Sequence, residues 1–142
     1  MLQDLQIEKS ISINASASAV WQALVTPEII RQYLFGTETV TNWQEGSPII
    51  FQGTYEGTKY QDKGILKRVE PTKCLEYTYW SSFTGIEDVE ENYALVTYVI
   101  EESEGGCTLT ARQRYFASIE NQQHAGQNWG MVLEKIKEIV EA

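Results

Sequence analysis

Residues 118–142 read SIENQQHAGQNWGMVLEKIKEIVEA, and the rest of the chain is organised around them. Its apolar residues follow the i, i+3, i+4, i+7 and i+11 spacing of one helical stripe, while charged residues such as Glu134 and Lys135 fall off that stripe. The pattern predicts a long amphipathic helix whose apolar face must be covered by the rest of the chain. The stripe comprises Trp129, Val132, Leu133, Ile136 and Val140.

Most of the chain before this helix alternates with the period of two that is typical of strands. A first strand is predicted at 6–14, followed by a short helix at 17–25 that Ser16 can cap and a second helix that begins at Pro27 and reaches Tyr33. The predicted fold class is α+β: a curved antiparallel sheet of seven strands, two short helices between strands one and two, and the long helix along the inner face. The other six strands are predicted at 38–43, 49–56, 60–70, 74–81, 92–102 and 107–116.

Length and composition predict a single domain over residues 1–142. The net charge of −9, from 11 basic and 20 acidic side chains, opposes binding to nucleic acid or to an anionic membrane surface. No segment approaches the ~20 apolar residues that span a bilayer and the N-terminus lacks a secretion signal, so we expect no membrane insertion and a cytoplasmic location. Cys74 and Cys107 fit buried free thiols, with a disulfide between them as the alternative.

Several short motifs follow one another along the chain: AVWQAL at 19–24, TPE at 26–28, QEGSP at 44–48, GILKRVEP at 64–71, LEYTYW at 75–80, GCTLT at 106–110 and Gly130 in the last helix. Their order and spacing resemble the helix-grip fold of the START-like (SRPBCC) superfamily and, more narrowly, the family named after the activator of the heat-shock chaperone ATPase. The likeness spans nearly the whole chain. It implies a cavity between sheet and long helix that takes apolar or amphipathic molecules.

Aromatic residues dominate the candidate ligand-binding residues. If the strand alternation places Phe51 and Tyr77 inward, the inner wall is apolar with several hydroxyl groups, which suits an amphipathic ligand. The alternative is that the rings fill the core and each hydroxyl finds one partner. Gly126 and Gly130 indicate a close approach to the helix, either by a ligand or by packed side chains. The candidates are Tyr33, Phe35, Phe51, Tyr55, Tyr77, Tyr79, Tyr98, Gln113, Tyr115, Gly126, Trp129 and Gly130.

The sequence contains no recognisable catalytic or metal-binding motif. His124 is the only histidine and the cysteines lack the spacing of zinc ligands, so neither a metal nor another cofactor is expected. His124 is predicted to be a surface or capping residue. Asp62 is predicted to face water at its strand, with a buried proton donor or ligand anchor as the alternative.

These patterns favour a non-enzymatic START-like domain that binds a small hydrophobic or amphipathic molecule. One alternative is a protein-interaction module whose partner is a heat-shock chaperone. The other is an enzyme similar to polyketide cyclases and dehydratases, with Tyr77, Asp62 and His124 as acid and base. A monomer and a dimer paired through an edge strand are both left open.

Overall fold

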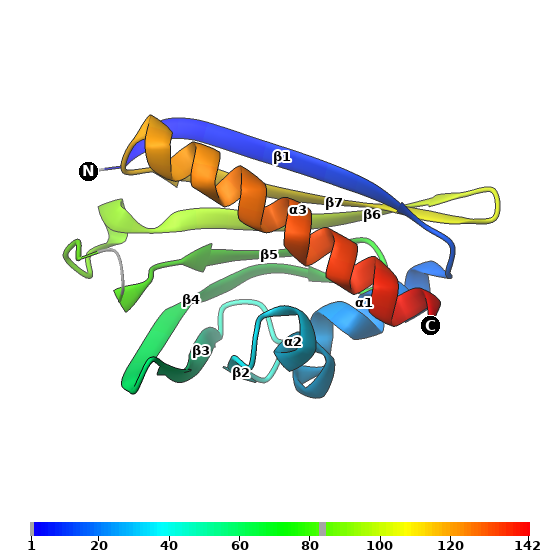
Figure 1. The fold of residues 1–142 in the computed structure, drawn as a ribbon, viewed down its shortest axis with the longest axis horizontal. Coiled ribbons are helices and arrows are strands. Elements are labelled where there is room, and N and C mark those ends of the chain that lie inside the picture. The colour runs from blue at the N-terminus through cyan, green and yellow to red at the C-terminus, as the bar shows by residue number, and fades with distance from the viewer. Residues whose placement is uncertain (1, 83–84) are drawn as a thin grey trace.

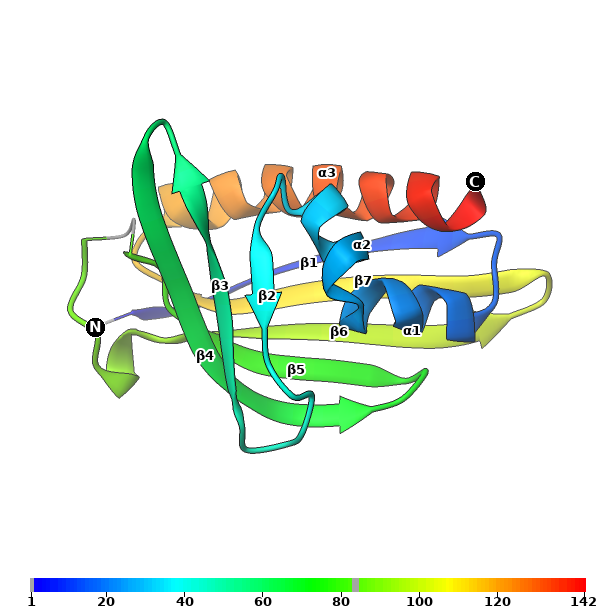
Figure 2. The ribbon, with the colours of Figure 1, turned by 90° about the horizontal axis from the view of Figure 1, so that it is seen from below.

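The computed structural model describes residues 2–82 and 85–142, and its fold is the predicted one. A curved, seven-stranded antiparallel sheet has the order β1-β7-β6-β5-β4-β3-β2, and the C-terminal helix α3 lies across its inner face (Figures 1 and 2). Two short helices, α1 and α2, connect β1 to β2. The elements are β1 (Gln3–Ile13), α1 (Ala17–Val25), α2 (Pro27–Tyr33), β2 (Glu38–Val40), β3 (Pro48–Tyr55), β4 (Thr58–Glu70), β5 (Cys74–Tyr79), the 3-10 turn η2 (Glu90–Asn92), β6 (Ala94–Ser103), β7 (Gly106–Phe116) and α3 (Ile119–Glu141).

All seven predicted strands differ from the observed ones by one to three residues at one or both ends, and for two of them the local structure gives the reason. The strand predicted at 38–43 ends at Val40, because the side chain of Asn42 accepts the backbone N–H of Gln44 and Trp43 has a φ of 60°. The strand predicted at 92–102 begins at Ala94, since the preceding residues form η2. The loop predicted at 82–91 includes residues 83–84, which lie outside the described residues.

Serine side chains begin the first and last helices. Ser16 Oγ accepts the backbone N–H of Ala19 at 3.1 Å, and Ser118 Oγ accepts that of Asn121 at 3.1 Å. Each bond satisfies one of the N–H groups that a helix start leaves without an internal partner. Thr26, also predicted as a cap, precedes α2 without a capping side-chain hydrogen bond.

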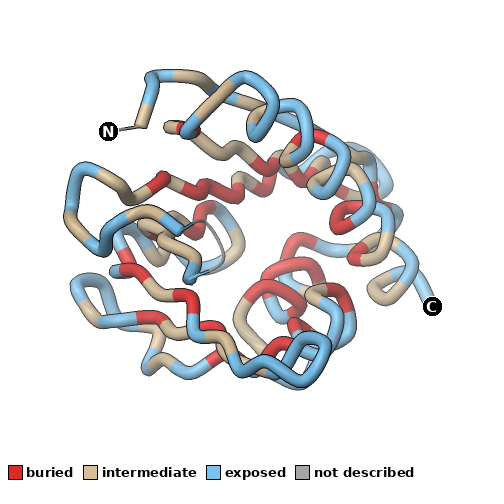
Figure 3. The backbone as a smooth tube through the Cα atoms, turned by 60° about the vertical axis from the view of Figure 1, so that its left-hand side comes forward, coloured by how far each residue is buried: buried red, intermediate tan, exposed pale blue. Residues whose placement is uncertain are grey.

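The apolar core occupies the space where the sheet faces α1, α2 and the C-terminal half of α3. Buried positions lie on these facing surfaces and exposed ones on their outer sides (Figure 3). From α3 the buried side chains are Val132, Leu133 and Ile136, three members of the predicted stripe. Cys74 and Cys107 are both buried free thiols.

Hydrogen bonds attach α3 to β1 and to the residue that follows it. Near the start of the helix, the Gln122 side chain donates to the Gln6 carbonyl at 2.7 Å. Near its end, Lys137 Nζ donates to the Ser12 carbonyl at 2.8 Å, and Glu141 accepts the backbone N–H of Asn14 at 2.7 Å. The helix is therefore fixed along one edge of the sheet.

Candidate ligand cavity

A cavity of about 1000 Å³ lies between the curved sheet and the N-terminal half of α3, and it opens partly to solvent. Strands β3 to β7 contribute its floor, α3 its roof, and residues after α2 and after β5 its rim. Phe35 and Tyr55 line it although 75% and 59% of their surfaces are exposed, which places them at its mouth.

Aromatic rings from β3, β5 and β6 form much of the floor. The ring of Phe51 on β3 lies 5.5 Å from that of Tyr77 and 6.0 Å from that of Tyr79, both on β5. Tyr98 on β6 follows in the sheet, so the rings form a continuous apolar wall with hydroxyl groups at intervals.

The roof meets this floor at Trp129. Its ring packs edge to face against Tyr98 at 5.5 Å, and its indole N–H donates to the side-chain oxygen of Gln113 at 2.9 Å. The contact joins α3 to β6 and β7 at the cavity wall. Val132, one turn further along α3, also contributes to the lining.

The hydroxyl groups of the buried tyrosines stay protonated at neutral pH. Burial raises the pKa of Tyr77, Tyr79 and Tyr98 well above the ordinary value of 10.0. For Tyr79 the negative charge of Asp62 raises the pKa further, and Tyr98 shares a hydrogen bond with Tyr77. These groups therefore act as neutral hydrogen-bond donors and acceptors.

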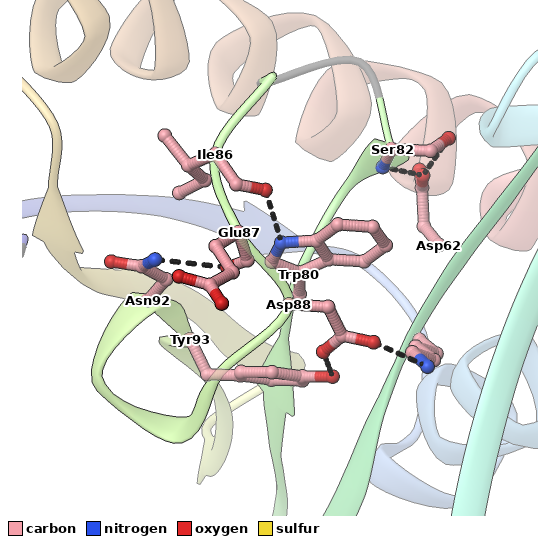
Figure 4. A network of polar contacts seen from close by, with 9 residues as sticks. Asp62, Trp80, Ser82, Ile86, Glu87, Asp88, Asn92 and Tyr93 are labelled. Atoms are coloured by element: carbon pink, nitrogen blue, oxygen red, sulfur yellow. Dashed lines mark hydrogen bonds and ion pairs between the residues drawn. The ribbon is translucent and has the colours of Figure 1, made fainter.

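Asp62 on β4 is the carboxylate of the cavity wall, and only 6% of its surface is exposed. Its Oδ2 accepts the Tyr79 hydroxyl at 2.8 Å, and its Oδ1 accepts the backbone N–H of Ser82 at 3.1 Å and the Ser82 hydroxyl at 3.5 Å (Figure 4). The prediction that Asp62 faces water is wrong. In the pleat of β4 it shares the inner face with Leu66, which is fully buried.

The connection between β5 and β6 is held at the rim by a second set of polar contacts (Figure 4). The Trp80 indole N–H donates to the Ile86 carbonyl at 3.2 Å. Asp88 pairs with Lys63 at 2.6 Å and accepts the Tyr93 hydroxyl at 2.5 Å, which raises the pKa of Tyr93, already raised by burial, to about 12. These bonds fix one side of the cavity mouth to β4.

Most of the residues predicted to bind a ligand line this one cavity. They are Phe35, Phe51, Tyr55, Tyr77, Tyr79, Tyr98, Gln113, Tyr115 and Trp129.

Three predicted residues lie outside the cavity lining: two of them pack elsewhere, and the third has open space beside it. Tyr33 is buried in the core and donates its hydroxyl to the Ala23 carbonyl at 2.9 Å. Gly126 packs on β1, where an added Cβ would lie 3.2 Å from the side chain of Ile7. Gly130 has nothing within 4 Å of such a Cβ.

Sequence reasoning missed the polar face of α3 that meets the cavity. Asn121, Ala125 and Asn128 share one helical face with Val132, a member of the predicted apolar stripe, and line the roof. His124, predicted to be a surface or capping residue and named only in the enzyme alternative, lines it too. His124 is exposed yet contributes to the lining. The i, i+4, i+7, i+11 spacing of these residues is a signal that could have identified a second stripe beside the apolar one.

In the described part of the chain, no group of three His, Cys, Asp or Glu side chains is arranged to hold a metal ion. No helix of residues 2–82 and 85–142 is both long and apolar enough to cross a membrane.

Comparison with known proteins gives one family and several similar structures. Residues 14–141 match the family model described as Activator of Hsp90 ATPase homolog 1-like protein. No match is found among curated proteins.

The solution structure of ChR145 from Cytophaga hutchinsonii is 35% identical, with a TM-score of 0.85 over 99% of this chain and 96% of that one. The crystal structure of MLL2253 from Mesorhizobium loti is 18% identical, with a TM-score of 0.78 over 96% of each chain. DynU16, from the dynemicin biosynthetic locus, is 15% identical, with a TM-score of 0.80 over 99% of this chain and 48% of that chain. The last two likenesses concern the fold alone.

Proposed function

The chain belongs to the Activator of Hsp90 ATPase homolog 1-like family, and we propose that this START-like domain binds a small hydrophobic or amphipathic molecule between its sheet and α3. The observation that carries the proposal is the cavity of about 1000 Å³, which has the size of a small-molecule site. Side chains from separate strands and from α3 leave this volume unfilled. Because the cavity opens partly to solvent, a small molecule could enter it and displace water from the apolar lining.

The lining supports an amphipathic occupant rather than a purely apolar one. Phe51, Val96 and Trp129 provide apolar contact, while Tyr98 and Gln113 place polar atoms on the same wall. A ligand with an apolar body and at least one polar group would satisfy both kinds of surface.

The proposal is tested with octanol and with the neutral fluorophore N-phenylnaphthylamine. Ala125→Phe places a ring into the cavity from α3, whereas Gln127→Phe adds the same ring at an exposed position outside the lining. We expect saturable binding of both probes by the wild type, at least about tenfold weaker binding by Ala125→Phe, and unchanged binding by Gln127→Phe. Circular dichroism confirms that each variant is folded.

Absence of saturable binding, or equal affinity in all three proteins, would overturn the proposal. Native mass spectrometry of the protein from its own cell extract then identifies the occupant. A small adduct that disappears on denaturation, and that is absent from Ala125→Phe, would give the ligand mass directly.

A second candidate function is acid–base catalysis on a polyketide-like substrate. The observation that favours it is that Asp62, Tyr77 and His124, from β4, β5 and α3, line the same cavity. Turnover of an aromatic polyketide-like compound that is lost in both Asp62→Asn and His124→Gln, with binding retained, would establish it. Binding of that compound without turnover would exclude it for this substrate class.

Family membership also makes a heat-shock chaperone a candidate partner. Co-purification with the chaperone and an increased ATPase rate on addition of this protein would support that role. An unchanged ATPase rate together with no co-purification would remove it.

A further inference from the structure

Among its described residues, the cavity wall carries a carboxylate but no lysine or arginine. Its lining residues, which all fall in the described segments, include the carboxylate of Asp62 and the imidazole of His124, but no lysine or arginine side chain. An anionic headgroup would therefore enter a cavity that offers it a negative charge and no positive one. The same carboxylate, with no cationic side chain beside it in the described lining, attracts a positively charged group.

Asp62 is buried among neutral donors. Among the described residues, the donors to its two oxygens are the Tyr79 hydroxyl and the N–H and hydroxyl of Ser82. No ion pair of the described residues involves Asp62. A buried carboxylate without a cationic partner is costly to maintain, and a ligand cation would offset that cost.

The nearest residue in sequence with a positive charge is directed elsewhere. Lys63 follows Asp62 on β4, and successive side chains of a strand point to opposite faces. Its ammonium pairs with Asp88 at 2.6 Å and lies 5.8 Å from the centre of the Trp80 ring. Lys63 is therefore paired with Asp88 and not with Asp62.

Two aromatic residues are direct neighbours of this carboxylate. Phe51 is the direct β3 neighbour of Asp62 in the strand register, and Tyr79 is bonded to it. The Phe51 ring in turn packs against Tyr77 and Tyr79. Ring faces attract cations through their quadrupole, and the attraction is stronger where water is excluded. A carboxylate beside several rings is thus suited to an ammonium group.

The charge of the whole chain acts in the same direction. The net charge of −9 attracts cations toward the molecule and repels anions. This long-range effect adds to the local one at Asp62.

We propose that the ligand is a cationic amphiphile, an amine with an apolar body, whose ammonium group lies at Asp62 among the Phe51 and Tyr79 rings while its body fills the cavity below α3. This inference rests on the proposed function and specifies the chemical class of the ligand. The ammonium uses the remaining acceptor capacity of the carboxylate, and the tyrosine hydroxyls supply further acceptors.

Three probes with the same alkyl chain test it by isothermal titration calorimetry: octylamine, octanol and octanoate. For the wild type we expect octylamine to bind about 10- to 100-fold more tightly than octanol, and octanoate most weakly, because a charged hydrogen bond in a buried site is worth that factor. In Asp62→Asn, octylamine should fall to the affinity of octanol. Octanol binding should persist, which shows that the cavity is intact.

Glu134→Gln is the matched control. It removes one negative charge from an exposed position of α3 outside the cavity lining, and so changes the net charge equally. It should retain the preference for octylamine. As a second measurement, the backbone amide resonance of Ser82, which donates to Asp62, should shift with octylamine and not with octanol.

The outcomes separate the two proposals. Octanol or octanoate binding as tightly as octylamine would overturn the cationic ligand and leave the binding module in place. An amine preference that survives in Asp62→Asn would also overturn it. Failure of all three probes to bind would remove the binding function itself.

Discussion

Replacing Gly64 by alanine should destabilise the fold strongly, because β4 passes too close to β5 for a side chain at this position. A Cβ on Gly64 would lie 1.6 Å from the carbonyl oxygen of Thr78 and 2.5 Å from its carbonyl carbon. Carbon–oxygen contacts between strands settle near about 3.3 Å. The two backbones would therefore have to move apart by about 1.7 Å at this point, whichever strand moves.

The cost follows from the bonds that hold the strands at this point. The backbone groups of Lys63 and Trp80 exchange two hydrogen bonds of 3.0 and 2.8 Å, and the Ile65 N–H donates to Thr78 Oγ1 at 2.8 Å. Loss of these three bonds, at about 1 kcal/mol each, gives about 3 kcal/mol for Gly64→Ala. For a chain of this length that corresponds to a fall in Tm of roughly 10 °C.

Gly130→Ala is the matched glycine-to-alanine substitution, and it should increase the free energy of unfolding instead of decreasing it. Nothing lies within 4 Å of a Cβ at Gly130, and the residue is inside α3, so alanine should stabilise by about 0.5–1 kcal/mol. Urea denaturation followed by circular dichroism measures both variants. A Gly64→Ala protein within about 0.5 kcal/mol of the wild type would refute the packing argument, whereas a destabilised Gly130→Ala would indicate a contact that the helix face does not show.

Three further effects can be measured in the same way. Tyr33→Phe removes the donor to the buried Ala23 carbonyl and should cost about 1–2 kcal/mol while leaving octanol affinity unchanged; weakened octanol binding would instead make Tyr33 a ligand contact. Ser118→Ala removes the cap of α3 and should cost about 1 kcal/mol, so an unchanged urea midpoint would contradict the capping role. Hydrogen bonds from Lys63 and Tyr93 lower the pKa of Asp88 below its usual 3.8, so Asp88 stabilises the fold above pH 3.8 and loses this contribution as the pH falls through the lowered pKa. The difference in free energy of unfolding between wild type and Asp88→Asn should therefore vanish in acid. A difference that grows as the pH falls would contradict a lowered pKa.

The sequence was most informative where local pattern and burial coincide. The stripe of α3 was correct because its residues face one continuous apolar surface, and Ser16 caps α1 because the cap is a short-range interaction. One of the two possible readings of the strand alternation places Tyr77 and Tyr98 on the inner face, and both rings line the cavity; that they bind a ligand stays a prediction.

The rest depended on relationships between distant segments. Asp62 has the strand phase of Leu66, but Ile65, an apolar residue in the opposite phase, is 38% exposed and obscures that alternation. The residue that bonds Asp62 most closely, Tyr79, comes from another strand, so no local pattern indicates a buried carboxylate there. Trp80 follows β5 and also lines the cavity, where its indole N–H donates to the Ile86 carbonyl. No strand or helix periodicity in the sequence predicts this position.

The one-sided attachment of α3 has a consequence for motion. Apart from the Trp129 bond to Gln113 on β7, the hydrogen bonds described above join α3 to Gln6, Ser12 and Asn14, at the edge of the sheet that lies opposite β2 and β3. The helix α3 could rotate about the line through these bonds without breaking the hydrogen bonds between the strands. Widening of the mouth would then be limited by the Trp129 contact with Tyr98 and Gln113. We expect ligand exchange to proceed by this rotation on the microsecond-to-millisecond scale, with relaxation dispersion concentrated around residues 121–132 and little in β6.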